Sequence, residues 1–163
     1  MKVFLYRHAH AVDGVPDADR ELSNKGLKQI KKLAKHIPSP ELEELAELWH
    51  SPLVRAEQTM THFKEQHRAC ADVPLYSVYE LAPDASVEEM AKLLAACEGD
   101  VVACGHNPFL EELLTSLVVG EPGLGMLKLK KGGMVCLERT TETSDYIPFG
   151  LWIIKWYWSP VFL

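Results

Sequence analysis

The sequence lacks the features that mark several large classes of protein. Its four cysteines include no Cys-x-x-Cys pair, so the ligand spacing of a zinc site is absent and reduced thiols are expected. The 17 Lys and Arg residues are outnumbered by 23 Asp and Glu, which argues against a nucleic-acid partner. There is no carboxylate cluster of the kind that holds magnesium, and no internal repeat or low-complexity segment. We therefore predict no metal and no cofactor.

Long hydrophobic runs are also missing. An uninterrupted run of only four hydrophobic residues precedes Arg7, too few for the apolar region of a signal peptide, so a cytoplasmic location is expected. The apolar segment 149–158 is too short for a membrane span and is interrupted by Lys155. It is interpreted as a strand buried on most of its length, with a peripheral membrane contact as the alternative. No membrane partner is expected.

What the chain does have is the composition and pattern of a globular α/β protein. Its 163 residues, 47% hydrophobic and 25% charged, fit a single domain over 1–163. Strands are predicted at about 2–6, 48–50, 73–79, 101–104, 133–139 and 151–158. Helices are predicted after Ser23, over 54–67, after Ser86 and after Pro108. The alternation predicts a mostly parallel sheet, with the last two strands as antiparallel additions at one side.

Basic side chains follow three of these strands at the point where each strand ends. Arg7 and His8 follow the first, Arg55 follows the second, and His106 follows the strand 101–104. Ligands of open α/β sheets bind beyond the carboxyl ends of the strands, so the four side chains are expected to meet there. A neutral imidazole is a good nucleophile for phosphorus, and guanidinium groups match the geometry of phosphate oxygens. The pattern therefore favours phosphoryl transfer to His8, with Arg7, Arg55 and His106 stabilising the charge of the transferred group.

Four segments then resemble one known family. Residues 5–9, Leu-Tyr-Arg-His-Ala, resemble the Arg-His-Gly signature of the histidine phosphatase (phosphoglycerate mutase-like) superfamily. Residues 51–59, Ser-Pro-Leu-Val-Arg-Ala-Glu-Gln-Thr, resemble its second motif, and residues 105–108, Gly-His-Asn-Pro, its third. Residues 22–26 match the Leu-Thr-x-x-Gly pattern ahead of the first helix. The short length and the Trp-rich C-terminal strand are most similar to the SixA-type phosphohistidine phosphatases.

The resemblance implies a three-layer α/β/α fold and a metal-independent phosphatase without cofactors. His8 would be the phosphorylated nucleophile, with Arg7, Arg55 and His106 around the phosphate. Arg20 and Asn107 would be further substrate contacts by the same resemblance. The implied substrate is phosphohistidine on a signalling or phosphotransfer protein. A small-molecule phosphomonoesterase and a catalytically weak phosphate- or phosphopeptide-binding module are the alternatives.

Two positions depart from the family pattern. Ala9 replaces a glycine, which costs little unless that residue needs a positive φ. Glu80 stands where mutase-type members carry a proton donor, but the pattern that follows it differs, so it is only a candidate general acid. An alkoxide leaving group needs a well-placed acid, whereas an imidazole, with a conjugate-acid pKa of about 6.5, does not. A weak acid position therefore favours phosphohistidine substrates.

The remaining polar candidates are interpreted more simply. The five other histidines show no metal-ligand spacing, and only His10 is expected at the mouth of the pocket. A cation in the first turn of a helix is unfavourable unless an anion lies beside it. For Arg55, that anion is either a bound phosphate or a surface partner such as Glu57 or Asp19.

Overall fold

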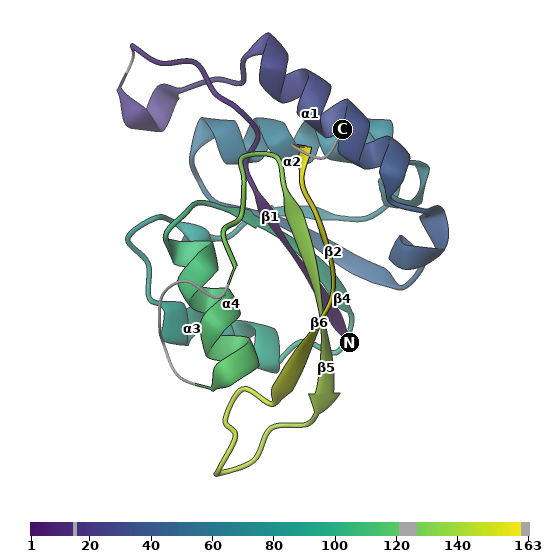
Figure 1. Cartoon of the computed structure of the whole chain (residues 1–163), viewed down its shortest axis with the longest axis vertical. Coiled ribbons are helices and arrows are strands. Elements are labelled where there is room, and N and C mark those ends of the chain that lie inside the picture. Colours follow the sequence, from purple (N-terminus) through teal and green to yellow (C-terminus); the bar gives the residue numbers. More distant parts are fainter. Residues whose placement is uncertain (15, 121–126, 161–163) are drawn as a thin grey trace.

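One six-stranded sheet runs through the molecule, with helices on both of its faces (Figure 1). The computed structural model describes residues 1–14, 16–120 and 127–160. The strand order is β3-β2-β4-β1-β5-β6. The strands are β1 (Lys2–Arg7), β2 (Leu45–His50), β3 (Leu75–Ser77), β4 (Asp100–Gly105), β5 (Met134–Thr141) and β6 (Leu151–Trp158). The first four are parallel, whereas β5 and β6 are added by antiparallel pairing, as the sequence predicted.

The helices form two layers around this sheet. They are α1 (Asn24–His36), α2 (Val54–Gln66), α3 (Val87–Ala95) and α4 (Phe109–Val119). Short 3₁₀ turns are η1 (Asp17–Asp19), η2 (Ser39–Leu42), η3 (Arg68–Cys70) and η4 (Tyr79–Leu81). Helices α1 and α2 pack together on one face, and α3 and α4 on the other (Figure 1). The three-layer α/β/α arrangement is confirmed. Within the described residues, no helix combines the length and apolar character needed to cross a membrane.

Strand β1 shows how the sequence builds both layers. Successive side chains of a strand point to opposite faces of the sheet. Val3 and Leu5 accordingly join the core under α3 and α4, while Phe4 and Tyr6 join the core under α1 and α2. All four side chains are fully buried. A run with no polar residue is therefore what a central strand, covered on both faces, requires.

The last strand differs from the prediction. The expectation that β6 is buried on most of its length was wrong, because β6 is an edge strand and only Trp152 of its eight residues is buried. The register shifts by a bulge between Cys136 and Leu137. Trp152 therefore joins the core under α3 and α4, whereas Trp156 packs on the opposite core. The alternating pattern of tryptophans did not reveal this change of face, since a bulge inserts an extra residue.

The entry into α1 fixes the chain close to the end of β1. Ser23 caps the helix as predicted, with its Oγ accepting a hydrogen bond from Gly26 N–H at 3.2 Å. The Ser23 backbone N–H donates to the carbonyl oxygen of His10 at 3.0 Å. A Cβ on Gly26 would overlap that same carbonyl oxygen, so only glycine allows this close approach. The Leu-Ser-x-x-Gly segment therefore joins α1 to the loop that carries His8.

Candidate active site

The carboxyl ends of β1 and β4 bring the predicted histidines together. Arg7 pairs with Gly105 in the register of the two strands, so His8 and His106 follow side by side. Their ring centroids are 5.0 Å apart, and both side chains are almost fully buried. Arg55 reaches the same point from the first turn of α2, with its Nε 3.3 Å from Nε2 of His8. The structure thus gathers His8, Arg55 and His106 into one cluster.

The hydrogen bonds of His8 define which of its nitrogens can react. Nδ1 lies 2.7 Å from the carbonyl oxygen of Ala9. A carbonyl oxygen only accepts, so Nδ1 carries the proton and the lone pair of the neutral ring is on Nε2. That nitrogen faces the guanidinium of Arg55. Ala9 itself is buried and has no positive φ, so the replacement of the family glycine causes no backbone strain.

Arg55 is held by a carboxylate that the sequence did not single out. Its Nη2 donates to Oδ2 of Asp17 at 2.9 Å, and its Nη1 donates to the carbonyl oxygen of the same residue. The guanidinium is buried while Asp17 remains mostly exposed. The partners expected for a surface ion pair, Glu57 and Asp19, were the wrong carboxylates. Asp17 thus occupies both Nη groups of Arg55.

Three other polar residues of segment 51–59 make hydrogen bonds in or next to the site. Ser51 Oγ is 2.8 Å from Nε2 of His106. Gln58 Oε1 accepts the backbone N–H of Leu22 at 2.8 Å, which ties the loop ahead of α1 to α2. Thr59 Oγ1 accepts the N–H of Ala9 at 3.1 Å and donates to the carbonyl oxygen of Arg55. The spacing of this motif therefore supports the positions of His8, Arg55 and His106 together.

Arg7 belongs to a second network on the other side of His8. Its Nη1 donates to the carbonyl oxygen of Leu129 at 2.7 Å, while its buried Nε has no partner among the described residues. Asn107 Nδ2 donates to the same carbonyl at 3.0 Å and to Glu111 at 2.6 Å. Glu111 also accepts the N–H of Leu129 at 3.0 Å. Asn107 and Glu111 thus act as positioning residues for Arg7, a role for Glu111 that the sequence gave no reason to expect.

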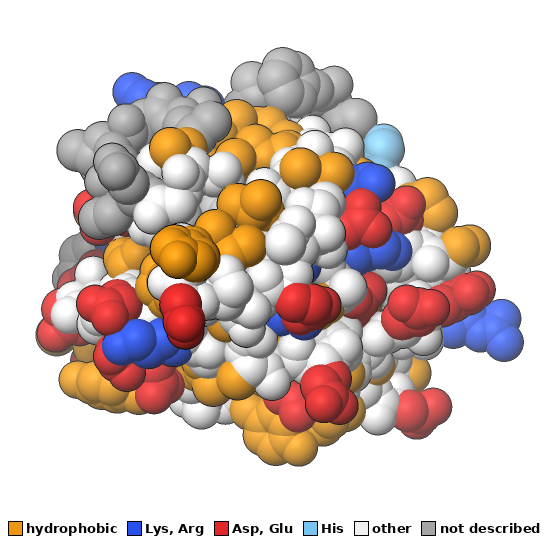
Figure 2. Space-filling view, turned by 90° about the horizontal axis from the view of Figure 1, so that it is seen from below, with side chains coloured by type: hydrophobic (Ala, Val, Ile, Leu, Met, Phe, Trp, Pro, Cys, Tyr) orange, Lys and Arg blue, Asp and Glu red, His pale blue; other side chains and the backbone are white. Residues whose placement is uncertain are grey.

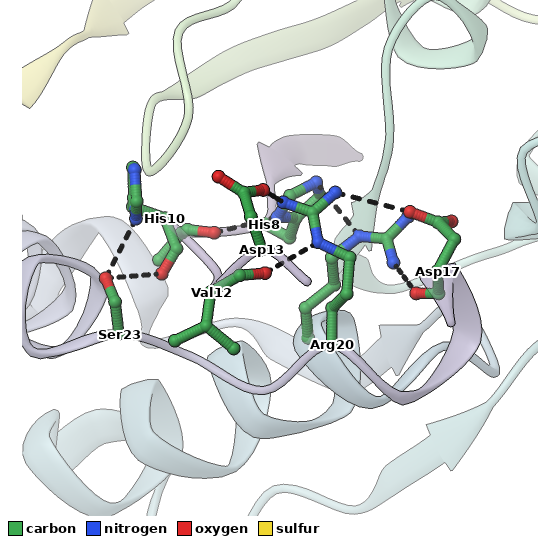
Figure 3. A network of polar contacts seen from close by, with 9 residues as sticks. His8, His10, Val12, Asp13, Asp17, Arg20 and Ser23 are labelled. Atoms are coloured by element: carbon green, nitrogen blue, oxygen red, sulfur yellow. Dashed lines mark hydrogen bonds and ion pairs between the residues drawn. The ribbon is translucent and has the colours of Figure 1, made fainter. Parts of the chain in front are cut away.

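Two predicted site residues are not brought to the histidines by any contact. Arg20 donates to Asp13 and Asp17 and to the carbonyl oxygen of Val12, in the network next to His8 that Figure 3 shows. It therefore reaches the site only through Asp17. Glu80 lies in η4, is exposed, and forms no hydrogen bond or ion pair among the described residues. Its role as a general acid stays a prediction without support from this geometry.

The electrostatics of the pocket keep both histidines neutral. Burial, assisted by the neighbouring His106 and the charges of Arg55 and Arg7, lowers the pKa of His8 to about 3. Burial likewise lowers the pKa of His106 to about 4, again assisted by Arg55. With Nε2 of His106 bonded to Ser51, its buried Nδ1 has no partner among the described residues. A neutral His8 offers its lone pair, and a neutral His106 can donate one hydrogen bond from Nδ1 when Ser51 donates to Nε2.

We expect the imidazoles of His8 and His106 to remain neutral down to about pH 5 in the free protein, whereas an ordinary histidine titrates near 6.5. Nitrogen-15 NMR of the histidine side chains across this range measures the outcome. The variants His8→Asn and His106→Asn assign the two signals by removing one each. A midpoint near 6.5 for either signal would contradict the expected shift.

The same shifts have a consequence for stability. The unfolded chain takes up these two protons near pH 6.5, but the folded protein does not until about pH 4 and pH 3. Between those values the unfolded state binds more protons, so the free energy of unfolding decreases as the pH falls. The urea midpoint should therefore drop between pH 7 and pH 5 by more in the wild type than in the two asparagine variants.

Comparison with known proteins identifies relatives of this arrangement. The family model of the histidine phosphatase superfamily (branch 1) matches residues 3–81. The protein histidine phosphatase SixA complexed with tungstate is 24% identical, with a TM-score of 0.81, over 99% of this chain and 98% of its own. SixA of Agrobacterium tumefaciens is 22% identical, with a TM-score of 0.73, over 98% of both chains. A search of curated proteins gives no match.

More distant enzymes share the fold. A mycobacterial glucosyl-3-phosphoglycerate phosphatase is 16% identical, with a TM-score of 0.69, over 94% of this chain and 96% of its own. The family match covers the strand that delivers His8, the loop with Asp17 and the whole of segment 51–59. The chain is thus similar to the histidine phosphatase superfamily in the sequence of residues 3–81, and it shares the fold of the SixA proteins over nearly its full length.

Proposed function

We propose that this phosphatase removes the phosphoryl group from phosphohistidine on a partner protein, without a metal ion, through a covalent intermediate on His8. The observation that carries the proposal is the orientation of the His8 ring. Its Nδ1–H is fixed by the carbonyl oxygen of Ala9, which leaves the lone pair of Nε2 beside the Arg55 guanidinium. A nucleophile and a phosphate-binding cation are therefore adjacent, as phosphoryl transfer requires.

The reaction follows in two steps. The Nε2 lone pair of His8 attacks phosphorus and the P–N bond of the substrate breaks; the substrate ring already carries a proton on its other nitrogen, so it leaves with the bonding pair as a neutral imidazole. Water then attacks the phosphorus of phospho-His8, the P–Nε2 bond breaks, and inorganic phosphate leaves. Arg7, Arg55 and His106 stabilise the charge on the oxygens in both steps, so neutralisation of the phosphoryl group is assigned to side chains of this chain rather than to a metal.

Neither of the two carboxylates considered as proton donors, Glu80 and Asp17, is a strong acid placed at the site, which favours phosphohistidine over phosphate esters. Glu80 is exposed and unbonded among the described residues. Asp17 lies beside Arg55, whose hydrogen bond lowers the pKa of the carboxyl group, so Asp17 is ionised at neutral pH and is a poor acid. An imidazole leaves with a conjugate-acid pKa of about 6.5 and can dispense with such a donor. The SixA proteins that share this fold are consistent with the same substrate class.

The test compares two leaving groups in the presence of a chelator. A phosphotransfer protein carrying phosphohistidine should be dephosphorylated with a kcat/KM at least about 100-fold above that for 3-phosphoglycerate, an alkoxide-leaving ester. Treatment with EDTA should change neither rate. Equal or greater activity on the ester would instead support a small-molecule phosphomonoesterase, and no phosphate release from any substrate would support a binding module.

The Asp17–Arg55 pair makes a separate prediction about anion affinity. A phosphate dianion must share the guanidinium with the Asp17 carboxylate, and the like charges repel. Asp17→Asn keeps the size of the side chain and removes its charge, so the inhibition constant of inorganic phosphate should fall about fivefold to tenfold, roughly 1 kcal/mol. Asp19→Asn makes the same charge change two residues away and should leave it unchanged. A weaker affinity in Asp17→Asn would mean that Asp17 mainly orients Arg55.

A further inference from the structure

A second hollow lies beside the phosphate pocket and is lined mostly by basic side chains. We call it the basic cleft; its volume is about 370 Å³. Its lining residues are His10, Lys25, Gln29, Lys130, Lys131 and Pro160. None of them belongs to the group His8, Arg7, Arg55 and His106. His10, which was expected at the mouth of the phosphate pocket, lines this separate cleft instead.

The cleft is fixed in position relative to His8 from two sides. On one side, His10 N–H donates to Oε1 of Gln29 at 2.9 Å, which joins the His8 loop to α1. On the other, the turn that follows Lys130 and Lys131 bonds to the end of β1: Gly132 N–H lies 3.1 Å from the carbonyl oxygens of both Arg7 and His8. A ligand that spans the cleft and the phosphate pocket therefore meets a rigid arrangement.

Glycine is required in that turn. Gly132 has a φ of 75°, and a Cβ there would approach the Gln29 side chain to 3.0 Å. A glycine thus allows the turn to close against α1. The two lysines before it are consequently presented next to the helix that carries Lys25.

The positive charges of the cleft have no acidic partners. Among the described residues, Lys25, Lys130 and Lys131 form no ion pair. The carboxylate of Asp13, which acts electrostatically on His10 and Lys131, is already bonded to Arg20 at 2.6 Å. Burial and the charges of Arg20 and Arg7 lower the pKa of Lys131, as expected where cations face one another.

This concentration contrasts with the rest of the molecule. The net charge of the chain is −6. Figure 2 shows the end of the molecule away from the carboxyl ends of the parallel strands, where acidic side chains are conspicuous among the charged ones. An uncompensated group of cations on an acidic protein repels itself unless an anion binds there, so the arrangement favours an anionic ligand.

Resting on the proposed function, we propose that the basic cleft binds carboxylate side chains of the substrate protein that lie next to its phosphohistidine. Lys25 and Lys130 are exposed and come from separate elements, so their charges are spread over the rim. Such a distribution suits several carboxylates on a protein surface, whereas one compact phosphate prefers converging donors such as arginine forks. The phosphate pocket would then supply the chemistry, and the basic cleft would select acidic surroundings and speed the encounter.

The test uses two synthetic peptides that carry phosphohistidine flanked either by three glutamates or by three glutamines. The wild type should hydrolyse the glutamate peptide with a kcat/KM about tenfold higher, because two or three partly exposed charge pairs each contribute up to about 1 kcal/mol. Raising the salt concentration to about 0.5 M should remove most of this preference, since the interactions are screened.

The variants assign the preference to the cleft. The double substitution Lys25→Glu and Lys130→Glu should abolish or invert the ratio of the two kcat/KM values. Lys31→Glu with Lys35→Glu makes the same charge change at exposed positions of α1 outside the cleft and should leave the ratio as in the wild type.

The outcomes separate this inference from the proposed function. If the wild type hydrolyses both peptides equally, or if the cleft variant keeps the preference, the inference is wrong and the proposed function stands. If the wild type hydrolyses neither peptide but releases phosphate from para-nitrophenyl phosphate, the proposed function fails and the inference fails with it. The salt dependence of the wild type decides the matter even if the cleft variant does not fold.

Discussion

His8→Asn is expected to lower kcat for phosphate release at least about 1,000-fold and to abolish the phosphoenzyme, because loss of a catalytic nucleophile costs on the order of 10³ to 10⁶ in rate. Asparagine can still donate a hydrogen bond to the carbonyl oxygen of Ala9, as Nδ1 of His8 does. What it lacks is Nε2, the nitrogen beside Arg55. The substitution therefore removes the reacting atom and retains the local hydrogen bond.

His50 provides a matched control for this experiment. It follows the same pattern at the end of the neighbouring strand β2: it is buried, and its Nδ1 lies 2.8 Å from the carbonyl oxygen of the next residue, Ser51. His50→Asn should keep kcat within a few-fold of the wild type. Rapid quench of a phosphohistidine substrate labelled with phosphorus-32 measures the phosphoenzyme directly. Equal activity of His8→Asn and wild type, or labelled protein in the His8 variant, would exclude His8 as the nucleophile.

The positions of the candidate site residues could be predicted because they depend on backbone rules alone. An apolar run without polar residues indicates a central strand, and parallel strands end at one edge, so Arg7, His8 and His106 had to meet. Segment 51–59 follows the end of β2 and leads into the first turn of α2, which places Arg55 at the same edge. The resemblance to a known family agreed with this placement at every one of these residues.

The partners of those side chains could not be predicted, because the paths of the loops decide which groups meet. Asp17 pairs with Arg55 across 38 positions of the sequence, and only the path of the loop 13–20 decides that it, rather than Asp19, faces the guanidinium. Glu111 supports Arg7 indirectly, through the backbone of Leu129. Such contacts leave no periodic pattern in the sequence.

The sequence pattern was also insufficient for two other features: the burial of the edge strand β6 and the orientation of Glu80, the candidate general acid. Whether β6 is covered depends on what packs outside it, and its bulge moves Trp152 to the other face without changing the hydrophobic pattern. Glu80 was selected from the order of motifs along the chain, but the short turn η4 leaves its side chain exposed. Order along the chain predicts an element, whereas side-chain direction depends on local turns.

Arg55→Met is expected to reduce kcat/KM by about 1,000-fold, within the range that the loss of an arginine at a transferring phosphoryl group produces. The methionine fills part of the buried volume without charge. Asp17, mostly exposed, turns to solvent once its partner is gone, so the fold should persist. Steady-state kinetics with phosphohistidine protein, and circular dichroism to verify folding, provide the measurement.

Arg55→Lys separates the charge of the residue from its geometry. Lysine restores a positive charge but presents one nitrogen, whereas the guanidinium contacts His8 through Nε and Asp17 through both Nη atoms. If the forked geometry of the guanidinium matters, kcat/KM of the lysine variant should be no more than about tenfold above that of Arg55→Met. This corresponds to about 1.4 kcal/mol of transition-state stabilisation. Full recovery would show that charge alone suffices.

Arg20→Met is the control, because Arg20 shares Asp17 with Arg55 but does not contact His8. It should change kcat/KM by less than about tenfold, as expected for an exposed ion pair. An effect as large as that of Arg55→Met would mean that the cation nearest to solvent, rather than the one bonded to Nε2 of His8, holds the phosphoryl group. In that case the Asp17 carboxylate, which now joins the two arginines, would have to move when substrate binds.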